Sequence, residues 1–183
     1  MRYSQIRSLD ISNGEGVGVA LFVQGCNLRC KNCFNSETWD FNGGMEWTEE
    51  VKNKFMELIN KPYITRVSIL GGEPLAYKNV NDVLNIVNEI RISFPEKTIW
   101  LYTGYNFDLL KSRYNEYKYT PFAANADEWL TRWEIISNVD VLVDGEYIDE
   151  QKDLTLKWRG SKNQRVIDVK HSLAQNKMVL YCE

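Results

Sequence analysis

The sequence lacks the features of membrane proteins, secreted proteins and nucleic-acid-binding proteins. No apolar run approaches the roughly 20 residues that span a bilayer. Residues 1–6 (MRYSQI) have neither the apolar stretch nor the small-residue cleavage site of a secretory signal. Lys and Arg number 22 against 25 Asp and Glu, a formal net charge of −3, and they form no basic run. We therefore expect a cytoplasmic protein with no membrane partner and no nucleic-acid partner.

Signs of a second domain are also missing. The chain has no internal repeat, no low-complexity segment and no linker rich in Pro, Gly or Ser. Its 183 residues, 44% of them hydrophobic, are enough to bury one sizeable core. The sequence thus predicts a single domain over residues 1–183.

Cysteine and histidine are scarce, with four and one in the chain. Cytoplasmic proteins keep their thiols reduced, so we expect no disulfides. Three cysteines, Cys26, Cys30 and Cys33, fall within eight residues, a spacing that favours a metal site. A structural zinc site usually takes two pairs of ligands, and the remaining candidates, His171 and Cys182, do not form a pair with each other. Unligated core cysteines are the other alternative.

The number of clustered cysteines is informative. Three thiolates can bind three irons of a [4Fe-4S] cluster and leave the fourth iron free for a substrate that brings its own donor atoms. An electron-transfer ferredoxin would normally close that position with a fourth cysteine. We therefore predict that Cys26, Cys30 and Cys33 are the metal ligands of a catalytic cluster.

Strand and helix patterns alternate along most of the chain. Such alternation implies parallel strands joined by crossover helices, an architecture in which ligands bind at the carboxyl ends of the strands. Helices are expected from a Thr48 N-cap to about Asn60, over residues 80–90, from about Phe107, and over 127–137. Strands are expected at residues 17–24, 65–70, 97–102 and 139–143, with shorter ones at 154–158, 165–169 and 178–181.

Small-residue turns follow two of the predicted strands. Gly71, Gly72, Glu73 and Pro74 end the second strand, where glycines allow close backbone approach and the carboxylate can accept a charge-assisted hydrogen bond from an ammonium group. Taken alone, such a tetrapeptide is more often a simple tight turn. A Thr-Gly turn at residues 103–104 ends the third strand, where it could admit a ligand or merely terminate the strand.

The cysteine loop, placed directly after a first strand, resembles that of the radical S-adenosylmethionine (SAM) superfamily. The resemblance implies an α/β fold, a partial (β/α) barrel of about five or six mostly parallel strands with flanking helices. It also implies that SAM chelates the open iron. The reduced cluster would then cleave SAM to methionine and a 5′-deoxyadenosyl radical, which abstracts a hydrogen atom from the substrate. The chain departs from many members in having Asn32 where they carry an aromatic residue, with Phe34 just after the third cysteine.

By the same resemblance, two segments bind SAM. Phe34 and the backbone around Asn32 and Cys33 line the adenine side. The turn after the second strand, with Glu73, matches the motif that binds the amino group of the methionine moiety. From the residues alone, the turn after the third strand could admit the ribose or simply end the strand. The predicted SAM-binding residues are Asn32, Cys33, Phe34, Gly71, Gly72, Glu73, Thr103 and Gly104.

A narrower resemblance, covering nearly the whole chain, is to the anaerobic ribonucleoside-triphosphate reductase activating proteins. It implies that the substrate is a glycine Cα–H near the C-terminus of the large reductase, and that a low-potential electron donor such as flavodoxin serves the cluster. Alternatives are activation of another glycyl-radical enzyme, a radical SAM reaction on a small molecule, and a non-catalytic zinc module. The matching segments are residues 21–35 (LFVQGCNLRCKNCFN), 69–74, 100–105 (WLYTGY), 140–147 (DVLVDGEY) and 158–169 (WRGSKNQRVIDV).

Overall fold

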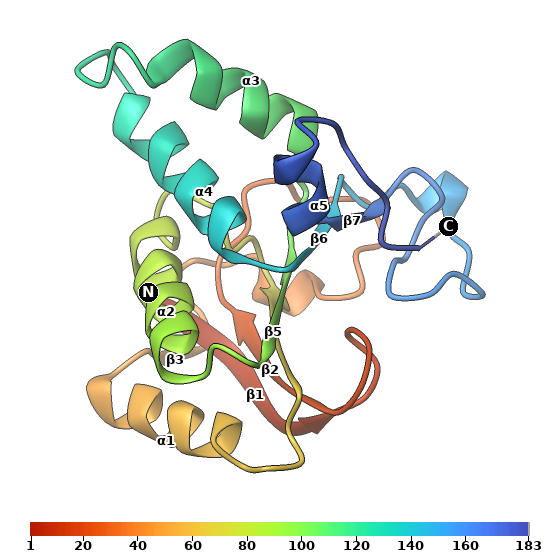
Figure 1. The fold of residues 1–183 in the computed structure, drawn as a ribbon. Helices are drawn as coiled ribbons and strands as arrows, with labels where there is room; N and C mark the ends of the chain where they lie inside the picture. The colour runs from red at the N-terminus through yellow and green to blue at the C-terminus, as the bar shows by residue number, and fades with distance from the viewer. Residues whose placement is uncertain (183) are drawn as a thin grey trace.

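The computed structural model describes residues 1–182, and its centre is one seven-stranded sheet (Figure 1). The strands are β1 (Arg2–Asp10), β2 (Gly18–Val23), β3 (Met45–Glu46), β4 (Arg66–Gly71), β5 (Thr98–Tyr102), β6 (Val141–Asp144) and β7 (Arg165–Asp168). They follow the order β3-β1-β2-β4-β5-β6-β7, and no pairing among the described residues joins β3 to β7, so the sheet is open. The central strands β2, β4, β5 and β6 run parallel, whereas β1, β3 and β7 are antiparallel to their neighbours.

The helices connect the strands and cover one face of the sheet. They are α1 (Glu49–Ile59), α2 (Val80–Ser93), α3 (Phe107–Tyr117), α4 (Ala126–Asn138) and α5 (Val169–Ala174), with 3₁₀ helices η1 (Ser36–Thr38) and η2 (Asp149–Gln151). Figure 1 shows α1, α2 and α4 along one side of the strands. The larger core lies there, with Val67 of β4, Val83 of α2 and Ile135 of α4 among its members. Within residues 1–182, no helix has the length and apolar composition required to cross a membrane.

The expectation of an α/β fold with flanking helices is confirmed, while the expected number and direction of the strands need correction. The described chain has seven strands rather than five or six, and three of the six pairings are antiparallel. The sequence did not indicate β1 because this strand lies near the edge of the sheet, where many of its side chains face solvent and few are apolar. The strand β3 has two residues and pairs with the start of β1.

Most other predicted elements match, including α1, whose N-cap Thr48 accepts a hydrogen bond from the Val51 N–H at 3.3 Å. Two predicted short strands are wrong. Residues 154–158 form turns, in which Trp158 adopts a φ of +59° and packs edge-on against Trp100 with 4.9 Å between ring centroids. In residues 178–181 the described strand pairing is a single bridge from Leu180 to Ile167. Trp158 and Tyr181 from these segments pack against Trp100 on the second face of the sheet, so these aromatic side chains serve packing rather than strand pairing.

Candidate functional site

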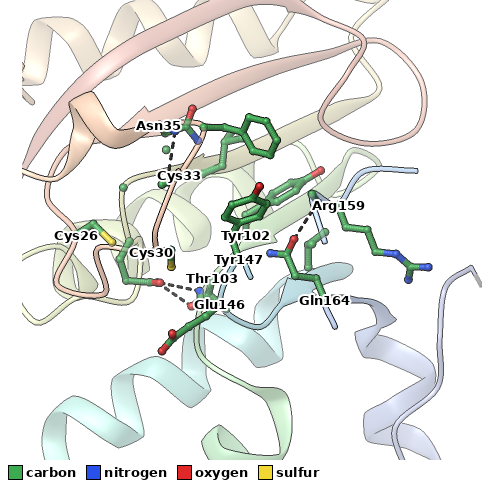
Figure 2. Close-up of a pocket in the computed structure, with 18 of the residues that line it drawn as sticks. Cys26, Cys30, Cys33, Asn35, Tyr102, Thr103, Glu146, Tyr147, Arg159 and Gln164 are labelled. Carbon is green, nitrogen blue, oxygen red and sulfur yellow. Dashed lines mark hydrogen bonds between the residues drawn. The ribbon is translucent and has the colours of Figure 1, made fainter. Parts of the chain in front are cut away.

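The three clustered cysteines lie on the loop that leaves β2, and all three line one cavity of about 510 Å³ (Figure 2). The start of this cysteine loop, residues 24–35, is tightly held. Gly25 and Cys26 donate their N–H groups to carbonyls at the end of η1, at 2.7 and 3.1 Å. Gly25 has a φ of +99°, and a β-carbon there would overlap the ring of Phe41, so the position requires glycine. Cys26 is buried, whereas Cys30 and Cys33 are half-buried.

Backbone donors surround the thiols. Cys26 accepts from two N–H groups within its own loop, Cys30 accepts from the N–H of Tyr147, and Cys33 accepts from the N–H of Asn35 at 3.4 Å. Burial raises the pKa of Cys26 and of Cys30, and these donors act against that rise. Because an N–H donor stabilises negative charge on sulfur, the arrangement suits thiolates that act as ligands.

The donors on this part of the cavity wall are thiols. Within residues 1–182, no three Cys, His, Asp or Glu side chains converge as the ligands of one ion would. A four-iron cluster binds each thiolate to a different iron, so its sulfur ligands are spaced apart around it. Cys182 packs on the second face of the sheet, against the apolar side chains around Trp100, and does not line the cavity. Among the described residues, the cavity therefore offers three thiols, the number that leaves one iron open.

The turn after β4 lies against the cysteine loop. Gly72 donates its N–H to the carbonyl of Val23 at 2.9 Å, and Glu73 donates its N–H to the carbonyl of Gly25 at 2.8 Å. A β-carbon on Gly72 would lie 2.5 Å from the carbonyl oxygen of Gly25. The two loops therefore touch backbone to backbone, and Gly71, with a φ of +104°, starts the turn that brings them together.

The side chain of Glu73 is buried at the centre of this site, with 1% of the residue exposed. Its carboxylate accepts hydrogen bonds from the Leu75 N–H at 2.9 Å, the Thr103 hydroxyl at 2.7 Å and the Gly104 N–H at 2.8 Å. Burial raises the pKa of Glu73, and these three donors, with the charge of Arg132, act to lower it. Since an ionised carboxylate can accept about four hydrogen bonds, one position remains for a ligand.

The buried guanidinium of Arg132 contacts the loops that follow β4 and β5. Arg132 of α4 donates from Nε to the carbonyl of Leu75 at 2.9 Å, pairs with Glu128, and lies 4.7 Å from the ring centroid of Tyr105. The hydroxyl of Tyr105 in turn accepts a hydrogen bond from Nη2 of Arg132 at 3.3 Å and lies near Asn27 of the cysteine loop. Helix α4 thus ties together the turns after β4 and β5 and the cysteine loop.

Three buried donors on the cavity wall have no hydrogen-bond partner within the described chain. They are the indole N–H of Trp39, the hydroxyl of Tyr102 and the Nε–H of Arg159. Figure 2 shows Tyr102 between the cysteines and Arg159. Buried polar groups are normally hydrogen-bonded. These donors are therefore available to a molecule that carries hydrogen-bond acceptors.

Comparisons with known proteins agree with this geometry. A family model described as a 4Fe-4S single cluster domain matches residues 12–167. The anaerobic ribonucleoside-triphosphate reductase-activating protein of Salmonella typhi is 37% identical over 168 residues, which cover 91% of this chain and 97% of that protein. The proteins of the same name from Escherichia coli K12 and Enterobacteria phage T4 are 36% and 35% identical over 91% of this chain, and 97% and 93% of their own lengths are covered. The chain belongs to the anaerobic ribonucleoside-triphosphate reductase-activating protein family.

In this member of the activating-protein family, the predicted site residues surround one cavity with one exception. The exception is Asn32, which does not line the cavity; its Nδ2 donates to Oδ2 of Asp149 at 2.6 Å. The predicted residues that line the cavity are Cys26, Cys30, Cys33, Phe34, Gly71, Gly72, Glu73, Thr103 and Gly104.

The sequence did not point to several other cavity residues of this activating-protein family member. Trp39 belongs to none of the motifs, and Glu146 lies in the matching segment 140–147 but was not predicted as a site residue. Both residues reach the cavity from loops. Tyr102 is the last residue of a predicted strand. That position is where a parallel sheet presents side chains to a ligand, so it could have identified Tyr102.

Proposed function

We propose that this chain is a radical SAM enzyme that installs a glycyl radical on a large anaerobic ribonucleoside-triphosphate reductase. Its relatives are named for activating that reductase, and the matching family model describes a 4Fe-4S cluster domain. The observation that carries the proposal is the convergence of three strand-end loops, each with a predicted motif, on one cavity. Three thiols and a buried carboxylate on its wall suit a cluster and an ammonium-bearing cosubstrate bound side by side.

In this proposal Cys26, Cys30 and Cys33 hold three irons of a [4Fe-4S] cluster, and the fourth iron is left for SAM. The reduced cluster supplies one electron that cleaves SAM to methionine and a 5′-deoxyadenosyl radical, which takes a hydrogen atom from the substrate. Because Cys30 and Cys33 are half-buried, a cluster bound to them has an edge near the protein surface. A low-potential donor such as flavodoxin can deliver an electron there.

Other wall residues bind and orient SAM in this proposal. Glu73 accepts a charge-assisted hydrogen bond from the ammonium group of the methionine moiety. Phe34 and Cys33, without Asn32, line the adenine side, and the turn after β5 leaves room for the ribose. The cavity of about 510 Å³ lies within the range of about 300 to 1,000 Å³ of ordinary ligand sites.

The cavity must also admit a glycine of the partner protein. Hydrogen abstraction requires the reacting atoms to be held at near-attack distance, about 3 to 3.5 Å. Leu154, which is 76% exposed, and Phe34 give the cavity an apolar rim. A polypeptide loop that packs against this rim would exclude water from the reacting groups.

The proposal is tested by incubating the reduced protein anaerobically with SAM and the anaerobic reductase of the same organism. We expect 5′-deoxyadenosine together with a glycine-centred doublet in the electron paramagnetic resonance spectrum of the reductase. SAM cleavage without a radical on the reductase, in a mixture where the two proteins bind, would contradict the activase function. Another glycyl-radical enzyme or a small molecule would then be the substrate. A colourless protein with zinc in place of iron would contradict the radical SAM chemistry as well.

A further inference from the structure

The segment that follows β6 packs against the cysteine loop at residues that do not line the cavity. Asn32 donates to Asp149 at 2.6 Å, and Nζ of Lys31 pairs with Oε1 of Glu150 at 3.0 Å. Asp149 also accepts a hydrogen bond from the hydroxyl of Tyr147 at 2.9 Å. The first two contacts join residues 117 and 119 positions apart in the chain. The outer side of the cysteine loop is therefore held by a distant part of the sequence.

The ring of Phe34, although 54% of the residue is exposed, contacts the same part of the chain. Its centroid lies 5.1 Å from that of Tyr147, and Nζ of Lys152 lies 5.1 Å from its centroid. A β-carbon on Gly160 would lie 2.9 Å from Phe34 and 3.2 Å from Tyr147, so glycine permits this close packing. Tyr147 and Gly160 both belong to the C-terminal segments that carry the narrower family resemblance.

These contacts extend to a cluster thiol. The backbone N–H of Tyr147 donates to the sulfur of Cys30. The hydroxyl of the same tyrosine is held by Asp149, which also holds Asn32, two residues beyond Cys30. Asn32 has a φ of +54°, a left-handed conformation that a non-glycine residue keeps only where surrounding contacts favour it.

We propose that Asp149 is a positioning residue for the cluster. By accepting hydrogen bonds from Asn32 and Tyr147 together, it holds Cys30 against its backbone donor and slows the loss of iron. The inference rests on the proposed [4Fe-4S] cluster. The connection between β6 and β7 thus packs against the outer side of the cysteine loop and stabilises it, although this connection holds none of the proposed ligands.

The neighbouring Glu150 provides a matched control. Glu150 carries the same charge as Asp149 and pairs with Lys31 through side chains that are 67% and 71% exposed. Glu150→Ala therefore removes one negative charge near the cysteine loop and leaves the contacts of Asp149 in place. Exposed ion pairs of this kind contribute little to stability. A change in iron release by Glu150→Ala would therefore report the effect of the lost negative charge.

The first experiment measures iron release from the reconstituted protein to a chelator under anaerobic conditions. Asp149→Ala and Asn32→Gly remove the hydrogen bond from either side, and glycine adopts a positive φ without added strain. We expect Asn32→Gly to release iron roughly three- to tenfold faster than wild type, as the loss of one hydrogen bond predicts, and Asp149→Ala to be at least as fast, because it also loses the bond from Tyr147. The double variant should be no faster than Asp149→Ala alone, because that variant already lacks the contact with Asn32. Glu150→Ala should stay within about twofold of wild type.

The second measurement uses the cluster-free protein and follows alkylation of each thiol by mass spectrometry. Cys30 should react faster in Asp149→Ala and in Asn32→Gly than in wild type or Glu150→Ala, with Cys182 as the internal reference. Wild-type rates in both variants, or an equal effect of Glu150→Ala, would overturn the role of Asp149 while the proposed function stands. A wild-type protein that binds no four-iron cluster would contradict the proposed function, and this inference with it.

Discussion

The carboxylate of Glu73 is constrained from several sides. Leu75 and Thr103 donate to Oε1, and Gly104 donates to Oε2. In Glu73→Gln the amide NH₂ would face at least one of these donors, and the charge that attracts an ammonium group would be lost. We expect SAM affinity to fall by about 1.5 to 3 kcal/mol, roughly ten- to 150-fold, while the iron content stays the same.

Calorimetric titration of the reconstituted protein with SAM measures this loss. Thr103→Val is the matched control, because it removes one donor to Glu73 and keeps the carboxylate charge; its loss of affinity should be smaller. Unchanged affinity in Glu73→Gln would leave Glu73 with a structural role in the turn.

The thiols of Cys26 and Cys30 make assembly of the proposed iron-sulfur cluster dependent on pH. Burial raises the pKa of Cys26 and Cys30 above the ordinary value of 9.0, so both are protonated in the metal-free protein at neutral pH. Ligand thiols must lose their protons, and cluster assembly therefore releases protons and is favoured as pH rises. At limiting iron and sulfide, we expect incorporation to increase between about pH 7 and pH 9, toward about four irons per chain.

Iron analysis and visible absorbance measure this incorporation. Ala at Cys26, Cys30 or Cys33 should abolish a stable cluster, whereas Cys182→Ala should retain it. Incorporation that does not change with pH would argue against proton release from these thiols. Loss of the cluster in Cys182→Ala would refute the assignment of three ligands.

At the level of elements, the carboxyl end of β5 meets the cysteine loop at one close contact. A β-carbon on Gly104 would overlap Cδ1 of Leu28, and both residues line the cavity. Gly104→Ala would therefore push Leu28 into the space proposed for SAM. Overpacking of this kind costs about 1 to 3 kcal/mol, so we expect SAM affinity to fall by about tenfold while the cluster remains.

The double variant Gly104→Ala/Leu28→Ala tests whether that contact is responsible. Removal of the Leu28 side chain leaves room for the new methyl group, so the double variant should bind SAM about as well as Leu28→Ala alone. A double variant as weak as Gly104→Ala would place the cause elsewhere in the turn.

At the scale of the whole molecule, a buried ion pair ties the connection between β1 and β2 to β4. The fully buried Arg66 donates from Nη2 to the carbonyl and the carboxylate of Asp10, at 2.8 and 2.9 Å, and from Nη1 to the carbonyl of Asn13 at 2.7 Å. Burial by itself would raise the pKa of Asp10, but hydrogen bonds from Arg66 and Asn13 bring it below the ordinary value of 3.8. Loss of Asp10 would leave a buried charge without its partner.

We expect Asp10→Asn to lower the free energy of unfolding by about 3 to 5 kcal/mol at neutral pH. Because the native pKa of Asp10 is depressed, its stabilisation is complete above the ordinary value of 3.8 and is lost as the pH falls through the native pKa. Denaturant unfolding of the cluster-free protein should show the gap between wild type and variant narrowing on acidification. Asp108→Asn, which removes an exposed partner of Arg165, should cost about 1 kcal/mol or less. A gap that stays constant with pH would contradict the assignment to Asp10.

Local sequence patterns predicted the residue types of the site and the parallel strands that carry them. The spacing of Cys26, Cys30 and Cys33 and the Gly-Gly-Glu turn are local patterns. The buried parallel strands β2, β4 and β5 appear as continuous apolar runs. Because parallel strands share one carboxyl edge, strand assignment alone predicted that their loops would meet. The strand β1, next to the edge strand β3, was not predicted because half-exposed strands carry a weaker apolar signal.

Which residues surround the cysteine loop depends on how the folded chain packs. Arg132 supports three loops from α4, and Tyr147 and Asp149 approach Cys30 and Asn32 from the connection after β6. These contacts form when β5 and β6 pair beside β4 and carry their loops over the cavity. Residues more than a hundred positions apart meet through that packing, and no local pattern of residue types encodes it.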